Sequence, residues 1–422
     1  MPLASRSSVP SRITALAAKR PTHSAFAWLH GNEKRILDWQ TDLCAIPAPP
    51  FGEQARSEWL AARFGELGLE KIRTDEAGNV LGFLPAPHLS PESTGPIVVL
   101  SAHLDTVFPA DTPIVPQLRT VRGADRLEGP GTCDNGAGVV GMLALAHALA
   151  QSGAALPAAL LFVGNVGEEG EGDLRGVRYL YAQHALAGRI AAHIVLDGAG
   201  SDAAVTQALG SRRYQVTIQG PGGHSFTDAG TPNPIAALAS ALATIAAAPT
   251  PDEPRTTLNL GTVHGGTSVN SIPESATATV DFRSTSAEEL LRLEVALNRA
   301  VEDAVEYWNS QATPAARLRG SLTFSVTTIG NRPAALLPED SPILQALKAV
   351  DRHLGLPSGV RLGSTDANIP LSLGVPALSL GAGGEGGGAH TLAEWYSPKN
   401  REIGLRRILL LTLAMIEWAA EQ

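Results

Sequence analysis

Residues 158–172 read AALLFVGNVGEEGEG, an apolar run that ends in small residues and is followed by two adjacent acids, Glu168 and Glu169. The run has the length and composition of a buried strand. Repulsion and desolvation both oppose two like charges at the end of such a strand. A solvated turn is one explanation. A pair of carboxylates with different chemical tasks is the other.

Three further apolar runs have the same character, and helical patterns separate them. They are Ile97–Ala102, Ile190–Leu196 and Ala377–Leu380, and Gly136–Gly153 is a typical helix between two of them. This alternation predicts an α/β fold with a mixed, largely parallel sheet flanked by helices. Apolar residues also recur at helical spacing from Phe26 to about Leu69, whereas roughly the first 20 residues are expected to be loosely ordered.

The sequence pattern changes near Gly210 and changes back after about Pro338. Between these points, alternating apolar and polar residues predict half-exposed strands. Ser286 and Glu289 form a capping box that opens a long amphipathic helix. We therefore expect an α/β domain built from residues 1–209 and 331–422, interrupted by an inserted α+β domain at residues 210–330.

Composition excludes several classes of protein. A chain of 422 residues with 44% hydrophobic and 17% charged residues is typical of a soluble protein of two domains. The net charge of -9 argues against nucleic acid or an anionic membrane as the partner. Two cysteines provide no disulfide framework, and no apolar run is long enough to span a membrane, so a cytoplasmic location is expected.

Histidines and acids cluster at the ends of the predicted strands. His103 and Asp105 end one strand, Asp134 stands at the start of a helix, Asp197 follows another strand, and His390 follows a run of glycines. Taken singly, each has an ordinary explanation, such as a surface pair, a helix N-cap or a flexible loop. Ligands of open α/β sheets gather at the carboxyl ends of strands. Two histidines with several carboxylates suit zinc, with cobalt or manganese as alternatives.

Eight short motifs follow one another along the chain. They are SAHLDTV, GTCDNGAG, GNVGEEGEG, VLDGAG, GPGGHS, GGTSVNSIP, VDFR and GGGAHT. With these motifs the chain, from about residue 36 to its C-terminus, resembles the two-metal exopeptidases and amidohydrolases that include peptidase T, glutamate carboxypeptidase, aminoacylase and acetylornithine deacetylase. The resemblance implies a zinc-exopeptidase-like catalytic domain with an inserted lid and dimerisation domain, in a homodimer.

The resemblance also implies two divalent metal ions and a role for each polar residue. His103 and Asp197 would bind one ion, Glu169 and His390 the other, and Asp134 would bridge them. Glu168 would be the general base, and Asp105 would orient His103. In the inserted domain, the substrate would contact His224, Asn270 and Arg283. The alternative for Arg283 is an ion pair with Asp281, two residues away on the same strand face.

These assignments lead to a hypothesis about activity. Asp at position 197 is typical of peptidase T and related di- and tripeptidases, which favours an exopeptidase acting on short peptides, from the N-terminus or on di- and tripeptides. An N-acyl-amino-acid deacylase or deacetylase is the alternative, because it would use the same metals and base. A non-catalytic binding protein would need a lost ligand or base. Cys133 is expected to be a buried small residue, and Asn135 to supply no ligand.

Overall fold

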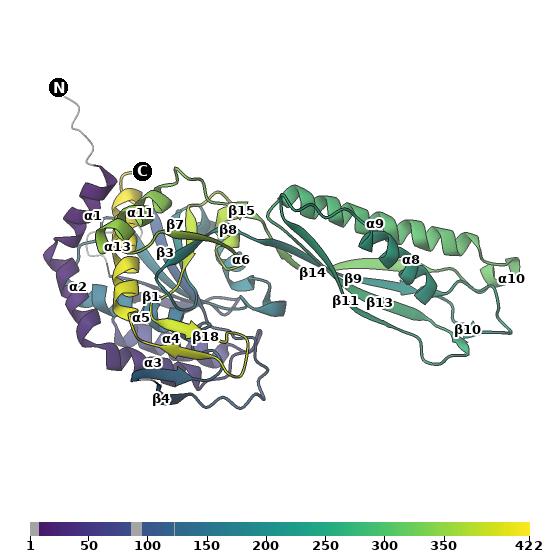
Figure 1. Ribbon diagram of the computed structural model, residues 1–422, viewed down its shortest axis with the longest axis horizontal. Coiled ribbons are helices and arrows are strands. Elements are labelled where there is room, and N and C mark those ends of the chain that lie inside the picture. The colour runs from purple at the N-terminus through teal and green to yellow at the C-terminus, as the bar shows by residue number, and fades with distance from the viewer. Residues whose placement is uncertain (1–7, 86–94, 122) are drawn as a thin grey trace, which may run out of the picture. The chain divides into compact units, whose positions relative to one another are not determined.

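The computed structural model describes residues 8–85, 95–121 and 123–422. The chain forms two compact units (Figure 1). The first unit combines the chain up to Ala208 with Leu336–Gln422, and the second is the continuous segment Leu209–Ala335. Every candidate metal ligand lies in the first unit. No helix of the described residues is long and apolar enough to cross a membrane.

The first unit is built on one large mixed sheet. In sheet order its strands are β1 (Glu70–Thr74), β2 (Val80–Phe83), β6 (Ala159–Asn165), β3 (Ile97–His103), β7 (Ile190–Leu196), β17 (Ala377–Leu380), β8 (Ala203–Ala208) and β15 (Ala335–Leu336), with β16 (Gly359–Gly363) beside β8. Strands β6, β3, β7 and β17 are mutually parallel neighbours. The pairs β1–β2, β2–β6 and β17–β8 are antiparallel. The four predicted apolar strands therefore form the centre of the sheet, and the predicted fold class is confirmed.

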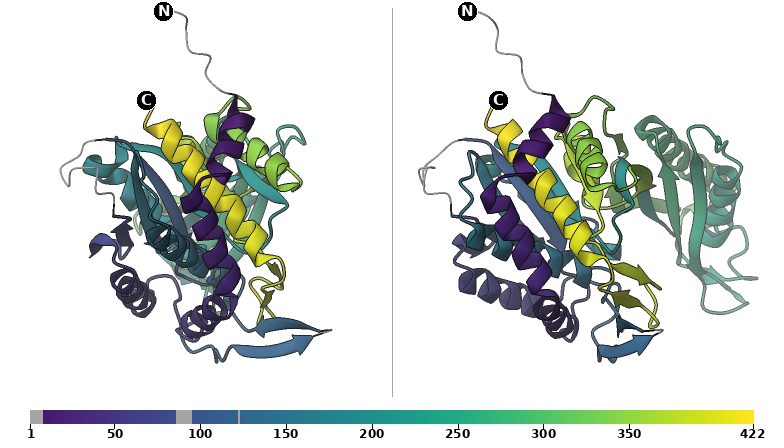
Figure 2. Two further views of the ribbon diagram at one scale, coloured as in Figure 1. Left: turned by 90° about the vertical axis from the view of Figure 1, so that its left-hand side faces the viewer. Right: turned by 60° about the vertical axis from the view of Figure 1, so that its left-hand side comes forward.

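Helices cover both faces of this sheet (Figure 2). Helices α5 (Gly136–Ser152) and α13 (Arg401–Ala419) contact β3 and β7. On the other face, Leu180 of α6 (Arg175–Ala182) and Leu186 of α7 (His184–Ala187) pack against Val99 and Leu161. The remaining helices of the unit are α3 (Glu33–Cys44), α4 (Gln54–Glu66), η1 (Gly170–Gly172), α11 (Pro342–Leu354) and α12 (Asn368–Ser372), together with two at the N-terminus. Burial on both faces explains why the central strands are continuous apolar runs.

The expectation of a loosely ordered N-terminus is wrong for the residues that the structure describes. Helices α1 (Val9–Ala17) and α2 (Arg20–Gly31) lie along α13 (Figure 2). Each has a proline in its first turn, where the missing N–H costs nothing. Ile13, Leu16 and Leu29 are buried. Residues 1–7, which the same expectation covered, lie outside the described residues.

A small second sheet in the first unit connects two loops that carry candidate ligands. Its strands are, in order, β18 (Glu385–Gly387), β19 (Trp395–Ser397), β5 (Ala124–Glu128) and β4 (Gln117–Val121). Strand β5 leads into the loop that ends at Asp134, and the connection from β18 to β19 contains His390. The Arg126 guanidinium lies 4.1 Å from the centre of the Trp395 ring. The sheet therefore ties together two segments whose ligands are 256 residues apart in the sequence.

The second unit is an antiparallel sheet with helices on one face. Its strands are, in order, β11 (Thr256–Gly265), β13 (Ser275–Ser284), β9 (Gly210–Gln219) and β14 (Thr323–Arg332). Helices α8 (Pro234–Ala246) and α9 (Ala287–Ser310) share a core with Tyr214, Val216 and Phe282, and a short helix α10 (Pro314–Arg317) follows. The Ser286 hydroxyl accepts the Glu289 N–H at 3.3 Å, which confirms the predicted N-cap of α9. Strands β10 (Gly223–His224) and β12 (Ser271–Ile272) form a separate small pair.

Candidate metal centre

The Glu168–Glu169 turn follows the end of β6 and is held by a third acid. Both glutamates are buried. The backbone N–H of Glu168 donates to Oδ1 of Asp105 at 3.0 Å, and that of Glu169 donates to Oδ2 at 2.7 Å. Asp105 is itself fully buried. Its carboxylate therefore fixes the backbone from which both glutamate side chains project, a task that the sequence did not reveal.

His103 stands at the end of β3 with its two ring nitrogens in different surroundings. Nδ1 lies 3.1 Å from the backbone carbonyl oxygen of Asp105 and 3.5 Å from its Oδ1. These acceptors assign the ring proton to Nδ1. Nε2 lies 3.1 Å from Oδ1 of Asp134 and 3.8 Å from Oδ1 of Asp197. Nε2 is therefore the nitrogen available to a cation, and Asp105 orients the ring.

Asp134 lies between the two histidines. Its Oδ1 lies next to His103, and its Oδ2 lies 3.1 Å from Nε2 of His390. The same Nε2 lies 3.1 Å from Oε1 of Glu169. His103, Asp134 and Glu169 offer donor atoms within 4.8 Å of one another, and they are the one such group in the described part of the chain. Asp197 and His390 adjoin this group, so the structure brings all five predicted ligands together.

The site holds an excess of negative charge, and the pKa values show it. Hydrogen bonding to Asp134 is the largest cause that raises the pKa of His390 to about 9. Burial lowers the pKa of His103, but hydrogen bonds to Asp105, Asp134 and Asp197 outweigh it and raise that pKa well above 6.5. Burial, with repulsion from Asp134, raises the pKa of Glu169 to about 7. The raised pKa values show that these side chains attract positive charge. Divalent cations would supply more of it than protons do, so the donor set fits two metal ions.

Asn135 holds the backbone around the central ligands. Its Oδ1 accepts the N–H of Gly138 and of Gly198, each at 3.1 Å, and its Nδ2 donates to the Leu196 carbonyl at 2.9 Å. One side chain thus joins the start of α5, just after Asp134, to the end of β7, just before Asp197. The Asp134–Asn135 peptide bond is cis.

Cys133 is buried, and burial raises the pKa of its thiol to about 12. The thiol is therefore protonated at neutral pH, as expected for a small packing residue.

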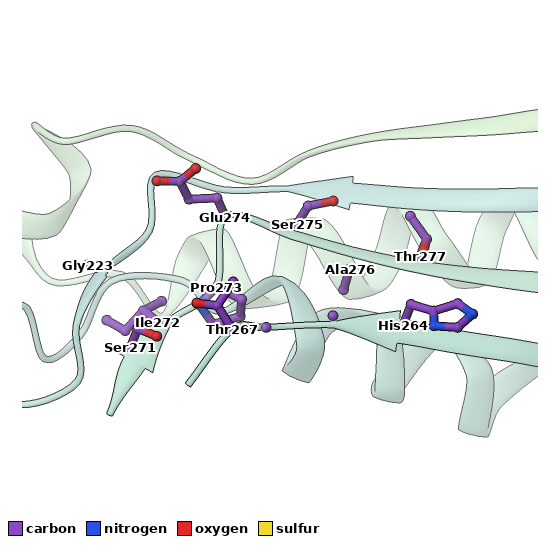
Figure 3. Close-up of a pocket in the computed structure, with 12 residues that line it drawn as sticks. Gly223, His264, Thr267, Ser271, Ile272, Pro273, Glu274, Ser275, Ala276 and Thr277 are labelled. Carbon is purple, nitrogen blue, oxygen red and sulfur yellow. The ribbon is translucent and has the colours of Figure 1, made fainter. Parts of the chain in front are cut away.

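Two of the predicted substrate residues lie together in the second unit. The Ser225 N–H, next to His224, donates to the Asn270 carbonyl at 3.0 Å. Nδ1 of His224 lies 3.2 Å from the N–H of Phe226 and 3.3 Å from that of Thr227, so it accepts and the ring proton is on Nε2. A cavity of about 660 Å³ adjoins this pair, between residues Ser271–Pro273 and the strands that carry His264 and Thr277 (Figure 3).

Arg283 lies elsewhere in the second unit, on β13. Its Nε donates to Oδ2 of Asp281 at 2.8 Å, and the Arg213 Nε lies 3.4 Å from Oδ1 of the same carboxylate. The ion pair that the sequence offered as the alternative is therefore formed, and two guanidinium groups share one carboxylate.

Comparison with known proteins agrees with this arrangement. Residues 99–414 match the family described as Peptidase family M20/M25/M40. The chain belongs to this family. This membership confirms the resemblance inferred from the eight motifs, and it makes the protein a hydrolase.

Individual relatives differ in what they cleave. A probable carboxypeptidase of Aspergillus clavatus is 28% identical over 273 residues, which are 60% of this chain and 58% of that protein, so the match spans little more than half of its length. A succinyl-diaminopimelate desuccinylase of Stenotrophomonas maltophilia is 25% identical, over 72% of this chain and 84% of that protein. The crystal structure of a Staphylococcus aureus tripeptidase shares the fold, with a TM-score of 0.68 at 22% identity, over 93% of this chain and 99% of that one.

Proposed function

We propose that this protein is a two-metal exopeptidase that hydrolyses the amide bond of short peptides. The observation that carries the proposal is the position of Asp134, whose two carboxylate oxygens lie next to two different histidines. That geometry suits a carboxylate shared by two cations. Glu168 lies on the same turn as Glu169 but is not one of the three side chains, His103, Asp134 and Glu169, whose donor atoms lie within 4.8 Å of one another.

The five ligands divide into two sets around Asp134. His103 and Asp197 would hold one ion, and Glu169 and His390 the other, with zinc as the first candidate and cobalt or manganese as alternatives. When bound, the two ions polarise the scissile carbonyl and lower the pKa of a water molecule.

The protein itself moves the proton and stabilises the developing charge. Glu168 would accept a proton from the attacking water and deliver it to the leaving amine. The position of its backbone is fixed by Asp105, so the carboxylate has a defined place beside the ligands. His224 carries its ring proton on Nε2 and would donate it in a hydrogen bond to the negative charge that forms on the carbonyl oxygen. Asn270 and Arg283 would bind the polar or carboxylate end of the substrate.

A panel of substrates tests the proposal. Enzyme loaded with zinc, cobalt or manganese is incubated with dipeptides and tripeptides that are free, N-acetylated or C-amidated, and released amino acids are measured. Hydrolysis of free and C-amidated peptides, but not of N-acetylated ones, would identify an aminopeptidase. Turnover of no peptide, together with good turnover of N-acetyl amino acids, would refute the exopeptidase assignment.

The second candidate is an N-acyl-amino-acid deacylase. The similarity to a succinyl-diaminopimelate desuccinylase favours it, because that enzyme removes an acyl group from an amine. The same ligands and the same base would serve both reactions. N-succinyl and N-acetyl amino acids in the panel distinguish the two, and the ratio of their kcat/KM values to those of dipeptides decides between them.

We also propose that the protein is a cytoplasmic homodimer that assembles through the second unit. Strand β11 is at an edge of its sheet, and most of its side chains are exposed. His224 is exposed as well, and it would act on the substrate bound to the other copy. Mixing Glu168→Gln with His224→Ala protein should then restore activity that neither variant has alone. A monomeric mass in light scattering would refute the dimer. The two free, buried cysteines favour a cytoplasmic location, which subcellular fractionation tests.

A further inference from the structure

Glu394 is a buried acid whose carboxylate is occupied entirely by one loop. Its Oε2 accepts the N–H of Gly131 at 2.8 Å, and its Oε1 accepts the N–H of Cys133 at 2.8 Å and of Asp134 at 2.7 Å. The side chain is fully buried. Three hydrogen bonds from closely spaced backbone positions to one charged acceptor fix the path of that loop.

The segment that carries Glu394 also carries His390. Between them the chain makes a compact turn, in which the Thr391 N–H donates to the Gly388 carbonyl at 3.0 Å and the Glu394 N–H to the Thr391 carbonyl at 3.1 Å. Strand β19 begins at the next residue and pairs with β5. The Glu394 side chain therefore connects the loop of Asp134 directly to the loop of His390, whose Nε2 lies 3.1 Å from Asp134.

A buried guanidinium lies close to the same loop. Arg56, on α4, is fully buried, and it donates from Nε to the Ile46 carbonyl at 2.8 Å and from Nη1 to the Leu104 carbonyl at 2.9 Å. Its Nη2 has no hydrogen-bond partner among the described residues. This nitrogen lies close to Gly131, where a side chain would place its Cβ atom 3.5 Å from it. Leu104 separates His103 from Asp105. Arg56 thus holds the backbone between His103 and Asp105 through contacts of its own, which do not involve Glu394.

We propose that Glu394 is a positioning residue that holds Asp134 in register with His390 and thereby sets the affinity for the metal ion that Glu169 and His390 would hold. The inference rests on the proposed two-metal site. Loss of the Glu394 carboxylate would release three N–H groups and let Asp134 move relative to His390. The ion held by His103 and Asp197 would be affected less, because Asn135 fixes that side independently.

Metal binding to the Glu394→Gln variant tests this inference. The substitution replaces one of the two side-chain oxygens by an NH₂ group, which cannot accept an N–H. Titration with zinc in the presence of a chromophoric chelator should show one ion bound as in the wild-type chain and the other bound about 10- to 100-fold more weakly, the range typical of residues that orient metal ligands. The matched control is Asp351→Asn, which makes the same chemical change at a fully buried acid bonded to Arg407 on α13.

The outcomes separate a positioning role from a merely structural one. The control variant should lose thermal stability but bind both ions with wild-type affinity. The inference would be overturned if Glu394→Gln bound both ions with wild-type affinity. It would also be overturned if the control variant bound both ions more weakly to the same extent. If Glu394→Gln does not fold, Glu394→Asp replaces it. This variant keeps the charge but shortens the side chain, so it should weaken binding of the same ion by a smaller factor, and unchanged affinity would again overturn the inference. A wild-type chain that binds two ions but cleaves no peptide would refute the proposed function alone.

Discussion

Metal binding and protons should compete for the same side chains, so metal affinity should rise steeply with pH. In the metal-free protein the pKa of His390 is about 9, so its imidazole carries a proton on both ring nitrogens near neutrality, and the pKa of His103 is raised in the same direction. A metal ion binds a ring nitrogen only after the proton on that nitrogen leaves. Each bound ion should therefore release protons at neutral pH.

The size of the effect follows from the pKa of His390. Between pH 9 and pH 7 the lost affinity would be about 50-fold for one competing proton with a pKa of about 9, or ~2.3 kcal/mol. The side chain of His390 is 55% exposed, so solvent screening reduces this, and we expect about tenfold. His103, which is buried, adds to the effect in the same direction. Below a pH of about 7 the proton on Glu169 adds a third competitor.

Stability of the metal-free protein should change in the opposite direction. A histidine whose pKa is raised by folding stabilises the fold fully below its unfolded value of 6.5, and this contribution is lost as the pH rises through about 9. Metal-free protein should therefore melt at a lower temperature at pH 9 than at pH 6.5. Protein saturated with metal should show little change over the same interval, because its rising affinity for the ions offsets that loss.

Calorimetric titration with zinc measures this competition directly. Repeating the titration in buffers of different ionisation enthalpy gives the number of protons released, which should be largest near pH 7 and decrease as the pH rises through about 9. His390→Ala should release fewer protons and show a weaker dependence on pH. An affinity that stays constant from pH 7 to pH 9, or release of no protons at pH 7, would show that the imidazoles are not the ligands.

Three further predictions concern single residues. Glu168→Gln should lower kcat by about 10²- to 10⁴-fold with an unchanged metal content, and retained activity would remove Glu168 from its role as the base. Asp351→Asn should lower the free energy of unfolding by about 3–5 kcal/mol in chemical denaturation, because it leaves the Arg407 guanidinium buried and partly unpaired. Arg283→Lys should raise KM more than it lowers kcat if the guanidinium binds a substrate carboxylate. A change in melting temperature alone would show that Arg283 has no role beyond its ion pair with Asp281.

The central strands and the metal ligands could be predicted from the sequence because both are local signals. Strands β7 and β17 have the predicted bounds, since a strand buried on both faces must be apolar at every position. The ligands stand directly after such strands or at the start of a helix, where a charged residue is conspicuous.

Residues that support the ligands could not be predicted, because their partners are distant in the sequence. Glu394 bonds to the backbone of Asp134, 260 residues away, and nothing in the surrounding TLAEWY distinguishes it from a surface acid. The sequence links Asp105 to His103 alone, because its bonds to the backbone of Glu168 depend on two strands being neighbours. Helix α1 escapes prediction because its apolar residues are few and matter only once α13 is in place, whereas the helical spacing from Phe26 onward predicts the end of α2.

The position of β17 has a consequence for how the chain is made. This strand lies between β7 and β8 in the sheet, yet it is synthesised after the whole of the second unit. Until residue 380 has left the ribosome, β7 and β8 lack the strand that joins them, and β7 has an unpaired apolar edge. A chain that stops before β17 should therefore aggregate rather than form half of the enzyme. The second unit, whose own core is continuous in sequence, is free to fold during that interval.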